Sequence, residues 1–190
     1  DGPFIVVVRT REEFSRWLRD PLPGAEALQV EGLMGDPEPW SLAAQGTLPI
    51  PIDVVLAEPA TEFSALYRLV DVRSGRDVRV TIPARPGLLK ALRLAVSLQL
   101  PVRLLPGQPG PGSLAELSQA LDFYLHDSMV ETPIEFFHST LAVFRGLGDG
   151  SLWSFLDQDP STFSRRDEAG QPLQPADFVD THFLRLLAEG

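Results

Sequence analysis

The chain contains no cysteine, and Lys90 is the one lysine among its 16 basic residues. Without cysteine the chain has no disulfide, no thiol nucleophile, no cysteine-ligated iron–sulfur cluster and no zinc site that uses cysteine. His126, His138 and His182 are the only imidazoles. We therefore expect neither a metal nor a cofactor to be bound by this chain.

Long apolar runs and clusters of cations are also missing. No run approaches the roughly 18 to 20 residues that cross a bilayer, and no basic segment precedes an apolar one at the start. The 26 acidic residues outnumber the 16 basic ones and give a net charge of −10, and the arginines between residues 9 and 19 are interleaved with acidic residues. We therefore expect a cytoplasmic protein that binds no nucleic acid and no membrane, because both need clustered cations. A neutral or positively charged partner fits this charge better.

What the sequence does contain is a repeat of apolar segments. Hydrophobic residues make up 44% of its 190 residues, enough for a folded domain with a core. Apolar, largely β-branched runs recur about every 25 residues. They occupy Phe4–Val8, Ala27–Val30, Ile52–Leu56, Val78–Ile82 and Val102–Leu105. Read as continuous apolar runs, they predict strands buried on both faces, as in parallel sheets.

The segments between these runs carry helix-start patterns. Thr10 with Glu13, and Ser113 with Glu116, fit capping boxes, while Pro86 and Asp36–Pro39 also mark helix starts. Repeated right-handed βα units build either a doubly wound sheet or part of a barrel. We predict an α/β fold in which residues 1–130 form about five βα units, as a mainly parallel sheet or a partial TIM-like barrel.

One segment allows two interpretations. Residues 67–72 and 78–82 flank Arg73-Ser74-Gly75-Arg76, and because Ser-Gly is a turn signal they could pair as a hairpin. The alternative is a helix followed by a strand, which we prefer because it keeps the spacing of the repeat.

The pattern changes after residue 130. Thr132-Pro133-Ile134-Glu135 fits a capping box with proline in the first turn, and it predicts a helix through Phe144. Residues 151–156 form a short amphipathic piece, 159–175 are polar and predict a loop, and 176–188 predict a final helix. We expect residues 131–190 to be a helical extension packed on the same domain.

Four polar residues follow the ends of predicted strands. They are Glu31, Glu58, Arg85 and Gln108. Because ligand sites of α/β sheets and barrels lie at the carboxyl ends of the strands, we predict that these four bind a cation, an amine or a peptide. The alternative is that they are ordinary polar loop residues.

Other candidate sites have less in their favour. Glu131, Glu135 and His138 have spacings that fit a metal site, but Pro133 interrupts the helix between the two glutamates and no further histidine is near. Ser139 lacks the G-x-S-x-G elbow of a hydrolase. The loop 107–112 has the position of a phosphate loop but no lysine, and its prolines remove backbone donors, so a rigid turn is expected. We predict no catalytic residue and no metal ligand.

A family resemblance rests on three segments. They are Ser151–Phe163, Asp167–Gln171 and the βα unit from Arg79 to Leu105. Over about residues 50–170 the chain resembles radical S-adenosylmethionine proteins of the SPASM type, which mature peptides. The C-x-x-x-C-x-x-C motif of that family is absent, as are its auxiliary-cluster cysteines. The resemblance therefore implies a cluster-free form that holds a peptide substrate for a radical enzyme, or completes the barrel of that enzyme.

Three functions follow from these observations. The first is a non-catalytic partner subunit that binds a peptide substrate or partner enzyme in a peptide-modification or cofactor-maturation system, where an exposed sheet edge can pair with another chain. The second is a small-molecule enzyme with Glu31 or Glu58 as general base and Arg85 as anion clamp. The third is a metal protein that uses Glu135 and His138. We favour the first.

Overall fold

A computed structural model describes residues 3–46, 50–147 and 164–174, and in these ranges the chain forms one seven-stranded parallel sheet. The strand order is β6-β5-β4-β3-β2-β1-β7, so six strands follow one another in chain order and β7 is added beside β1. The strands are β1 (Phe4–Val8), β2 (Ala25–Glu31), β3 (Ile52–Val55), β4 (Val78–Pro83), β5 (Val102–Leu105), β6 (Ile134–Glu135) and β7 (Ser164–Arg166).

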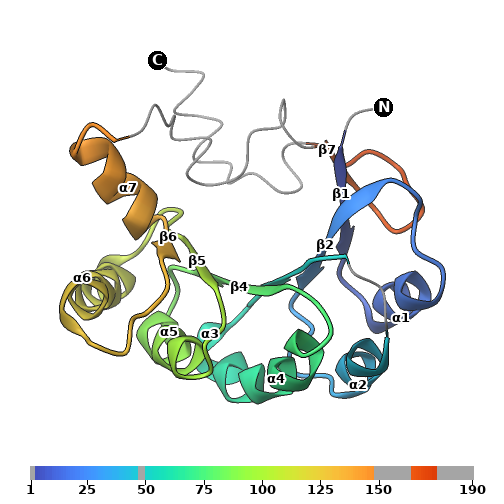
Figure 1. Cartoon of the computed structure of the whole chain (residues 1–190), viewed down its shortest axis with the longest axis horizontal. Coiled ribbons are helices and arrows are strands. Elements are labelled where there is room, and N and C mark those ends of the chain that lie inside the picture. Colours follow the sequence, from blue (N-terminus) through green and yellow to red (C-terminus); the bar gives the residue numbers. More distant parts are fainter. Residues whose placement is uncertain (1–2, 47–49, 148–163, 175–190) are drawn as a thin grey trace.

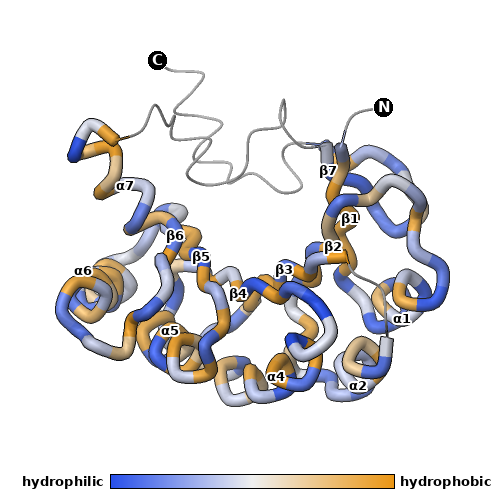
Figure 2. Tube along the Cα trace, viewed as in Figure 1, coloured by the Kyte–Doolittle hydropathy of each residue, from blue (hydrophilic) through white to orange (hydrophobic). Residues whose placement is uncertain are grey.

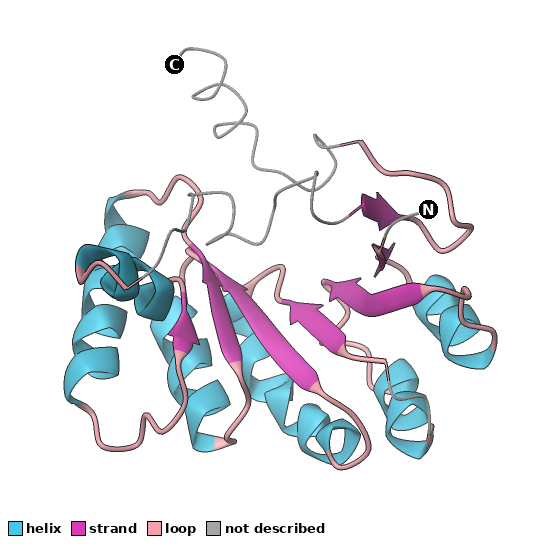
Figure 3. Ribbon diagram, turned by 45° about the horizontal axis from the view of Figure 1, so that its top comes forward, coloured by secondary structure: helices cyan, strands magenta, loops and turns pink. Residues whose placement is uncertain are grey.

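Helices cover the convex face of this curved sheet, as Figure 1 shows. They are α1 (Arg11–Arg19), α2 (Glu38–Gln45), α3 (Pro59–Glu62), the 3-10 helix η1 (Phe63–Tyr67), α4 (Arg68–Arg73), α5 (Leu88–Ser97), α6 (Pro111–His126) and α7 (Phe137–Phe144). Helices α1 to α6 lie on the convex side, and α7 follows β6 at the sheet edge (Figures 1 and 3). Sequential parallel strands with helices on one side form a partial barrel, because a doubly wound sheet has helices on both sides. The predicted α/β fold of βα units is confirmed.

The hydrophobic core lies between the sheet and these helices. Val6, Leu28, Val54, Val80 and Leu104 point toward the helices and are almost fully buried. Figure 2 shows hydrophobic stretches along the sheet and hydrophilic ones on the outer turns of the helices.

The concave face of the sheet, here called the inner face, differs from the prediction. Polar residues occupy alternate positions of β2 to β5: Gln29, Asp53, Thr81 and Arg103 are all buried, at 7% exposure or less. For β2 to β5 the expectation of continuous apolar strands is therefore wrong, whereas the expected burial on both faces holds at these positions and along β1, whose five residues are all apolar and buried. The physical reason is the period of two in a strand: the apolar residues face the helices, and the residues between them face the concave side.

Of the two predicted capping boxes, one forms and the other does not. The Thr10 hydroxyl accepts a bond from Glu13 N, and the Glu13 carboxylate accepts one from Thr10 N, which confirms the capping box of α1. The second predicted box is wrong, because α6 begins at Pro111 and Ser113 is buried inside its first turn. Glu116 instead accepts bonds from Gly87 N and Leu89 N and so caps α5.

The ambiguous segment is a helix followed by a strand. Helix α4 ends at Arg73, and β4 begins at Val78 and runs parallel to β3. A hairpin between residues 67–72 and 78–82 is thereby excluded, and the preferred interpretation is confirmed.

The part after residue 130 contains helix α7, as predicted, and also two strands that were not. The helix predicted from the Thr132–Glu135 box begins later, at Phe137. Ile134 is buried in strand β6 instead, where it pairs with Val102 of β5. Residues 164–166, predicted as loop, form β7 beside β1. The segments 151–156 and 176–188 lie outside the described residues, so the amphipathic piece and the final helix predicted there stay predictions, as does the domain boundary at residue 130.

Among the described residues, no helix combines the length and the apolar character needed to cross a membrane.

Candidate functional site

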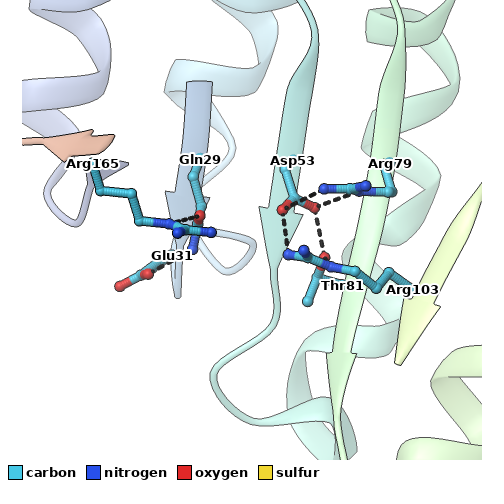
Figure 4. Close-up of polar contacts among 7 residues, drawn as sticks. All are labelled: Gln29, Glu31, Asp53, Arg79, Thr81, Arg103 and Arg165. Carbon is cyan, nitrogen blue, oxygen red and sulfur yellow. Dashed lines mark hydrogen bonds and ion pairs between the residues drawn. The ribbon is translucent and has the colours of Figure 1, made fainter. Parts of the chain in front are cut away.

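A buried carboxylate, Asp53, lies at the centre of the inner face. It accepts a hydrogen bond from Thr81 Oγ1 at 2.6 Å and one from an Arg103 terminal nitrogen at 2.7 Å. Arg79 donates to both of its carboxylate oxygens, at 3.3 and 3.2 Å. We call these four residues, which Figure 4 shows together, the Asp53 cluster.

The strand register brings the Asp53 cluster together. Asp53 in β3 lies opposite Arg79 in β4, and Thr81 in β4 lies opposite Arg103 in β5. All four side chains occupy alternate positions, so they share the inner face, and the long arginines reach across neighbouring strands. A single residue shift in this register would turn each of them into the hydrophobic core.

The Asp53 cluster stabilises the ionised form of its carboxylate. Burial raises the pKa of Asp53, but the guanidiniums of Arg103 and Arg79 and the hydrogen bonds to the carboxylate outweigh burial, so the pKa lies below its usual value. Asp53 is therefore ionised at neutral pH and holds no proton to donate. A general base works best with a pKa near the operating pH, and Asp53 is shifted the opposite way.

A second chain of polar contacts lies at the β7 side of the inner face. Arg165 Nε donates to Gln29 Oε1 at 3.3 Å, Gln29 Nε2 donates to Glu31 Oε1 at 2.9 Å, and Arg9 Nε lies 2.7 Å from Glu31 Oε2. Figure 4 shows Arg165, Gln29 and Glu31 beside the Asp53 cluster. These contacts link β7, β2 and the end of β1.

A cavity of about 650 Å³ opens at the amino ends of β2, β3 and β4. Its apolar lining residues are Ile5, Ala27, Pro51, Ile52, Val78 and Pro101, and its charged ones are Glu26, Asp53, Arg73, Arg76, Asp77 and Arg79. We call it the amino-end cavity. It reaches the Asp53 cluster through Asp53 and Arg79, so it and the cluster form one candidate site.

The predicted strand-end residues do not gather into one site. Arg85 lies 3.6 Å from Glu58 and donates to Ala57 O at 2.6 Å, so these two do meet, although both are more than half exposed. Glu31 instead pairs with Arg9 and Gln29. Gln108 is exposed in the loop after β5, and in the described part of the chain no contact joins it to the other three.

Glu135 and His138, the residues of the metal hypothesis, contact other side chains. Glu135 accepts a hydrogen bond from Ser139 Oγ at 2.7 Å, and His138 Nδ1 lies 3.1 Å from the Tyr124 hydroxyl. Burial raises the pKa of Tyr124, and the negative charge of Glu135 adds to this. In the ranges that the structure describes, no three His, Asp or Glu side chains are grouped closely enough to hold a metal ion.

The sequence did contain a signal for the Asp53 cluster. Leu28-Gln29-Val30-Glu31, Val78-Arg79-Val80-Thr81 and Val102-Arg103-Leu104 alternate apolar and polar residues, with a period of two. A charged residue inside such a run marks a strand with one polar face. Arg76 carried no comparable signal, because its burial depends on residues far away in the sequence.

No protein-family model, no curated protein and no solved structure matches this chain. The resemblance to radical S-adenosylmethionine proteins therefore rests on the quoted residues alone and stays a prediction.

Proposed function

We propose that this chain is a non-catalytic partner subunit that binds a peptide substrate or a partner enzyme, and that the amino-end cavity receives a segment of that partner. The observation that carries the proposal is the cavity itself. Its volume of about 650 Å³ lies in the range of ligand sites, which are mostly apolar with a few placed polar groups. Its apolar wall suits a hydrophobic side chain of the partner segment, and its charged residues suit a polar group next to that side chain.

The state of the carboxylates supports binding over catalysis. Asp53 is held by two arginines and a threonine, and its pKa is lowered. Glu31 is paired with Arg9 and Glu58 with Arg85. The enzyme alternative needs Glu31 or Glu58 as a free base and Arg85 as a free clamp, and these pairings give it less support.

The sheet edge fits the same proposal. Strand β6 covers β5 only at Val102 and Arg103, and within the described ranges no strand lies beside Leu104 and Leu105 on that side. Unpaired strand edges pair readily with another chain. Together with the resemblance, this leads us to propose a radical enzyme of peptide maturation as the partner.

The proposal is tested by co-expression with the products of the neighbouring genes, followed by co-purification and size-exclusion chromatography. Ala27→Phe places a ring in the cavity, while Ala115→Phe puts the same ring on the exposed side of α6. We expect a complex with the wild type and with Ala115→Phe, and at least a tenfold weaker one (about 1.4 kcal/mol) with Ala27→Phe. A monomer that binds none of these products, or a complex that tolerates both variants equally, would contradict the proposal.

A further inference from the structure

Arg76 borders the amino-end cavity, and among the described residues no carboxylate forms an ion pair with its guanidinium. The residue is only 6% exposed, and in the described part of the chain none of its three side-chain nitrogens has a hydrogen-bond partner. It lies between α4 and β4, at the amino end of β4. A buried arginine normally pairs with a carboxylate, a phosphate or several carbonyl oxygens, because leaving its donors unsatisfied is costly.

Loss of the proton does not remove this cost. Burial lowers the pKa of Arg76, yet arginine keeps its charge in proteins. The guanidinium is therefore a buried cation beside a cavity.

The neighbouring charges do not neutralise Arg76. Asp77 and Glu26 line the same cavity but are exposed, and within the described residues no ion pair joins either of them to Arg76. Asp53 already interacts with Arg79 and Arg103. The other cavity arginines are engaged as well, because Arg79 binds Asp53 and Arg73 donates to Leu98 O at 3.0 Å.

We infer that the amino-end cavity is a carboxylate-binding site in which Arg76 pairs with the carboxylate and the apolar wall holds the group that carries it. This inference rests on the proposed function, since it names the chemistry of the partner segment: a peptide carboxylate next to a hydrophobic side chain, as at a peptide C-terminus. Guanidinium and carboxylate match in a bidentate geometry.

A carboxylate fits better than a phosphate. Phosphate sites assemble several donors, such as grouped arginines or a helix N-terminus. This cavity offers one guanidinium without a partner, two exposed carboxylates nearby, and an apolar wall that includes Ile5, Ala27 and Val78. A singly charged anion on an apolar body matches that combination.

The net charge of −10 does not oppose this assignment. Exposed charges farther away than about 8–10 Å are largely screened at physiological salt, so the nearest groups decide which ligand binds. The expectation of a neutral or positive partner came from the charge of the whole chain. Inside the cavity, the unpaired Arg76 favours an anion.

Binding requires a change at Arg76. Its nitrogens are shielded in the ligand-free protein, and the guanidinium packs beside Gly46, where an added Cβ would lie 2.7 Å from one terminal nitrogen. The side chain must therefore turn toward the cavity to meet a ligand. The Arg76 Nε–H group is thus a direct reporter of binding.

The test uses N-acetyl-leucine and its neutral counterpart, N-acetyl-leucine amide, as probes. Titration of the wild type is followed by isothermal titration calorimetry and by the NMR signal of Arg76 Nε–H, which is assigned through its loss in Arg76→Gln. We expect the acid to bind at least about tenfold more tightly than the amide and to shift that signal, since a hydrogen bond to a charged group contributes this much. Arg76→Gln should abolish the difference, and Arg19→Gln, on the exposed end of α1, should retain it.

Each other outcome is decisive. Equal binding of acid and amide overturns the carboxylate assignment but leaves the proposed function standing. Tighter binding of inorganic phosphate than of N-acetyl-leucine also overturns it. Absence of any shift at Arg76 Nε–H also overturns it. The calorimetric comparison of acid and amide needs only the wild type, so the test holds even where Arg76→Gln fails to fold. The co-purification experiment judges the proposed function separately.

Discussion

Replacement of Asp53 by asparagine removes the carboxylate that Arg79 and Arg103 share. The substitution keeps the size of the side chain, so it opens no cavity, and the amide still offers an oxygen to Thr81 or to one arginine. What it removes is the negative charge that faces a guanidinium with only 4% of its side chain exposed, that of Arg103.

The expected loss follows from the burial of the two arginines. Removing one partner of a buried ion pair costs about 3–5 kcal/mol, because the other charge stays buried without compensation. The side chain of Arg79 is 36% exposed and can be hydrated, so its part of the loss is small. We therefore expect the free energy of unfolding to fall by about 3 kcal/mol, the lower end of that range.

Urea unfolding at pH 7 measures this loss, with an unchanged dependence on urea concentration as the sign that the unfolded state is the same. The matched control is Asp71→Asn on the exposed side of α4, which should change stability by no more than about 0.5 kcal/mol. The double variant Asp53→Asn with Arg103→Met should recover part of the loss, because no charge is then left uncompensated at Arg103. A loss for Asp53→Asn as small as that of the control would refute the reasoning.

The remaining predictions concern pH and two local contacts. Because the folded pKa of Asp53 is lowered, its stabilisation is present above its unfolded pKa of about 3.9 and is lost as the pH falls through the folded value. Thermal unfolding between pH 2 and 7 should therefore show the wild type and Asp53→Asn converging below about pH 4, and a constant difference would argue against the shift. Gly87→Ala should cost about 2 kcal/mol or more, because Gly87 has φ +88° and a Cβ there would lie 2.4 Å from Ala60 Cα; Gly35→Ala, with open space around it, is the control, and equal losses would contradict the clash. Thr10→Ala should cost about 1 kcal/mol through loss of the α1 cap, and an unchanged urea midpoint would show that the cap contributes nothing.

The repeat of βα units could be predicted because its determinants are local. The segments Phe4–Val8 and Val102–Leu105 form strands with the predicted bounds. The Thr10–Glu13 box forms as predicted, with Thr10 at the N-cap of α1. The same reasoning failed at Glu116, whose carboxylate caps α5 from another helix. A capping pattern cannot reveal a partner 29 residues away.

The short strands β6 and β7 show a second limit. Each has three residues or fewer, and pairing with β5 or β1 decides its conformation more than its own sequence does. Ile134 is an example: the capping pattern favoured a helix, but burial against Val102 favours the strand.

The sequence predicted a site at the carboxyl ends of the strands, whereas the amino-end cavity lies at the opposite end. The prediction relied on the general rule for α/β sheets, and that rule describes where ligands usually lie, not where this chain has its cavity. The sequence places Asp53, Arg79 and Arg103 between apolar residues. Whether their side chains contact one another depends on the register between neighbouring strands. Whether an arginine such as Arg76 is buried without a partner depends on tertiary packing and has no local pattern.

The most direct test of the partner-subunit proposal is methyl NMR of this chain in complex with the product of a neighbouring gene. We predict that the methyl signals of Ile5, Ala27 and Val78, which line the amino-end cavity, shift on binding, while that of Ala115 on α6 stays in place. Unchanged signals in the cavity, with shifts confined to the outer faces of the helices, would contradict the proposal.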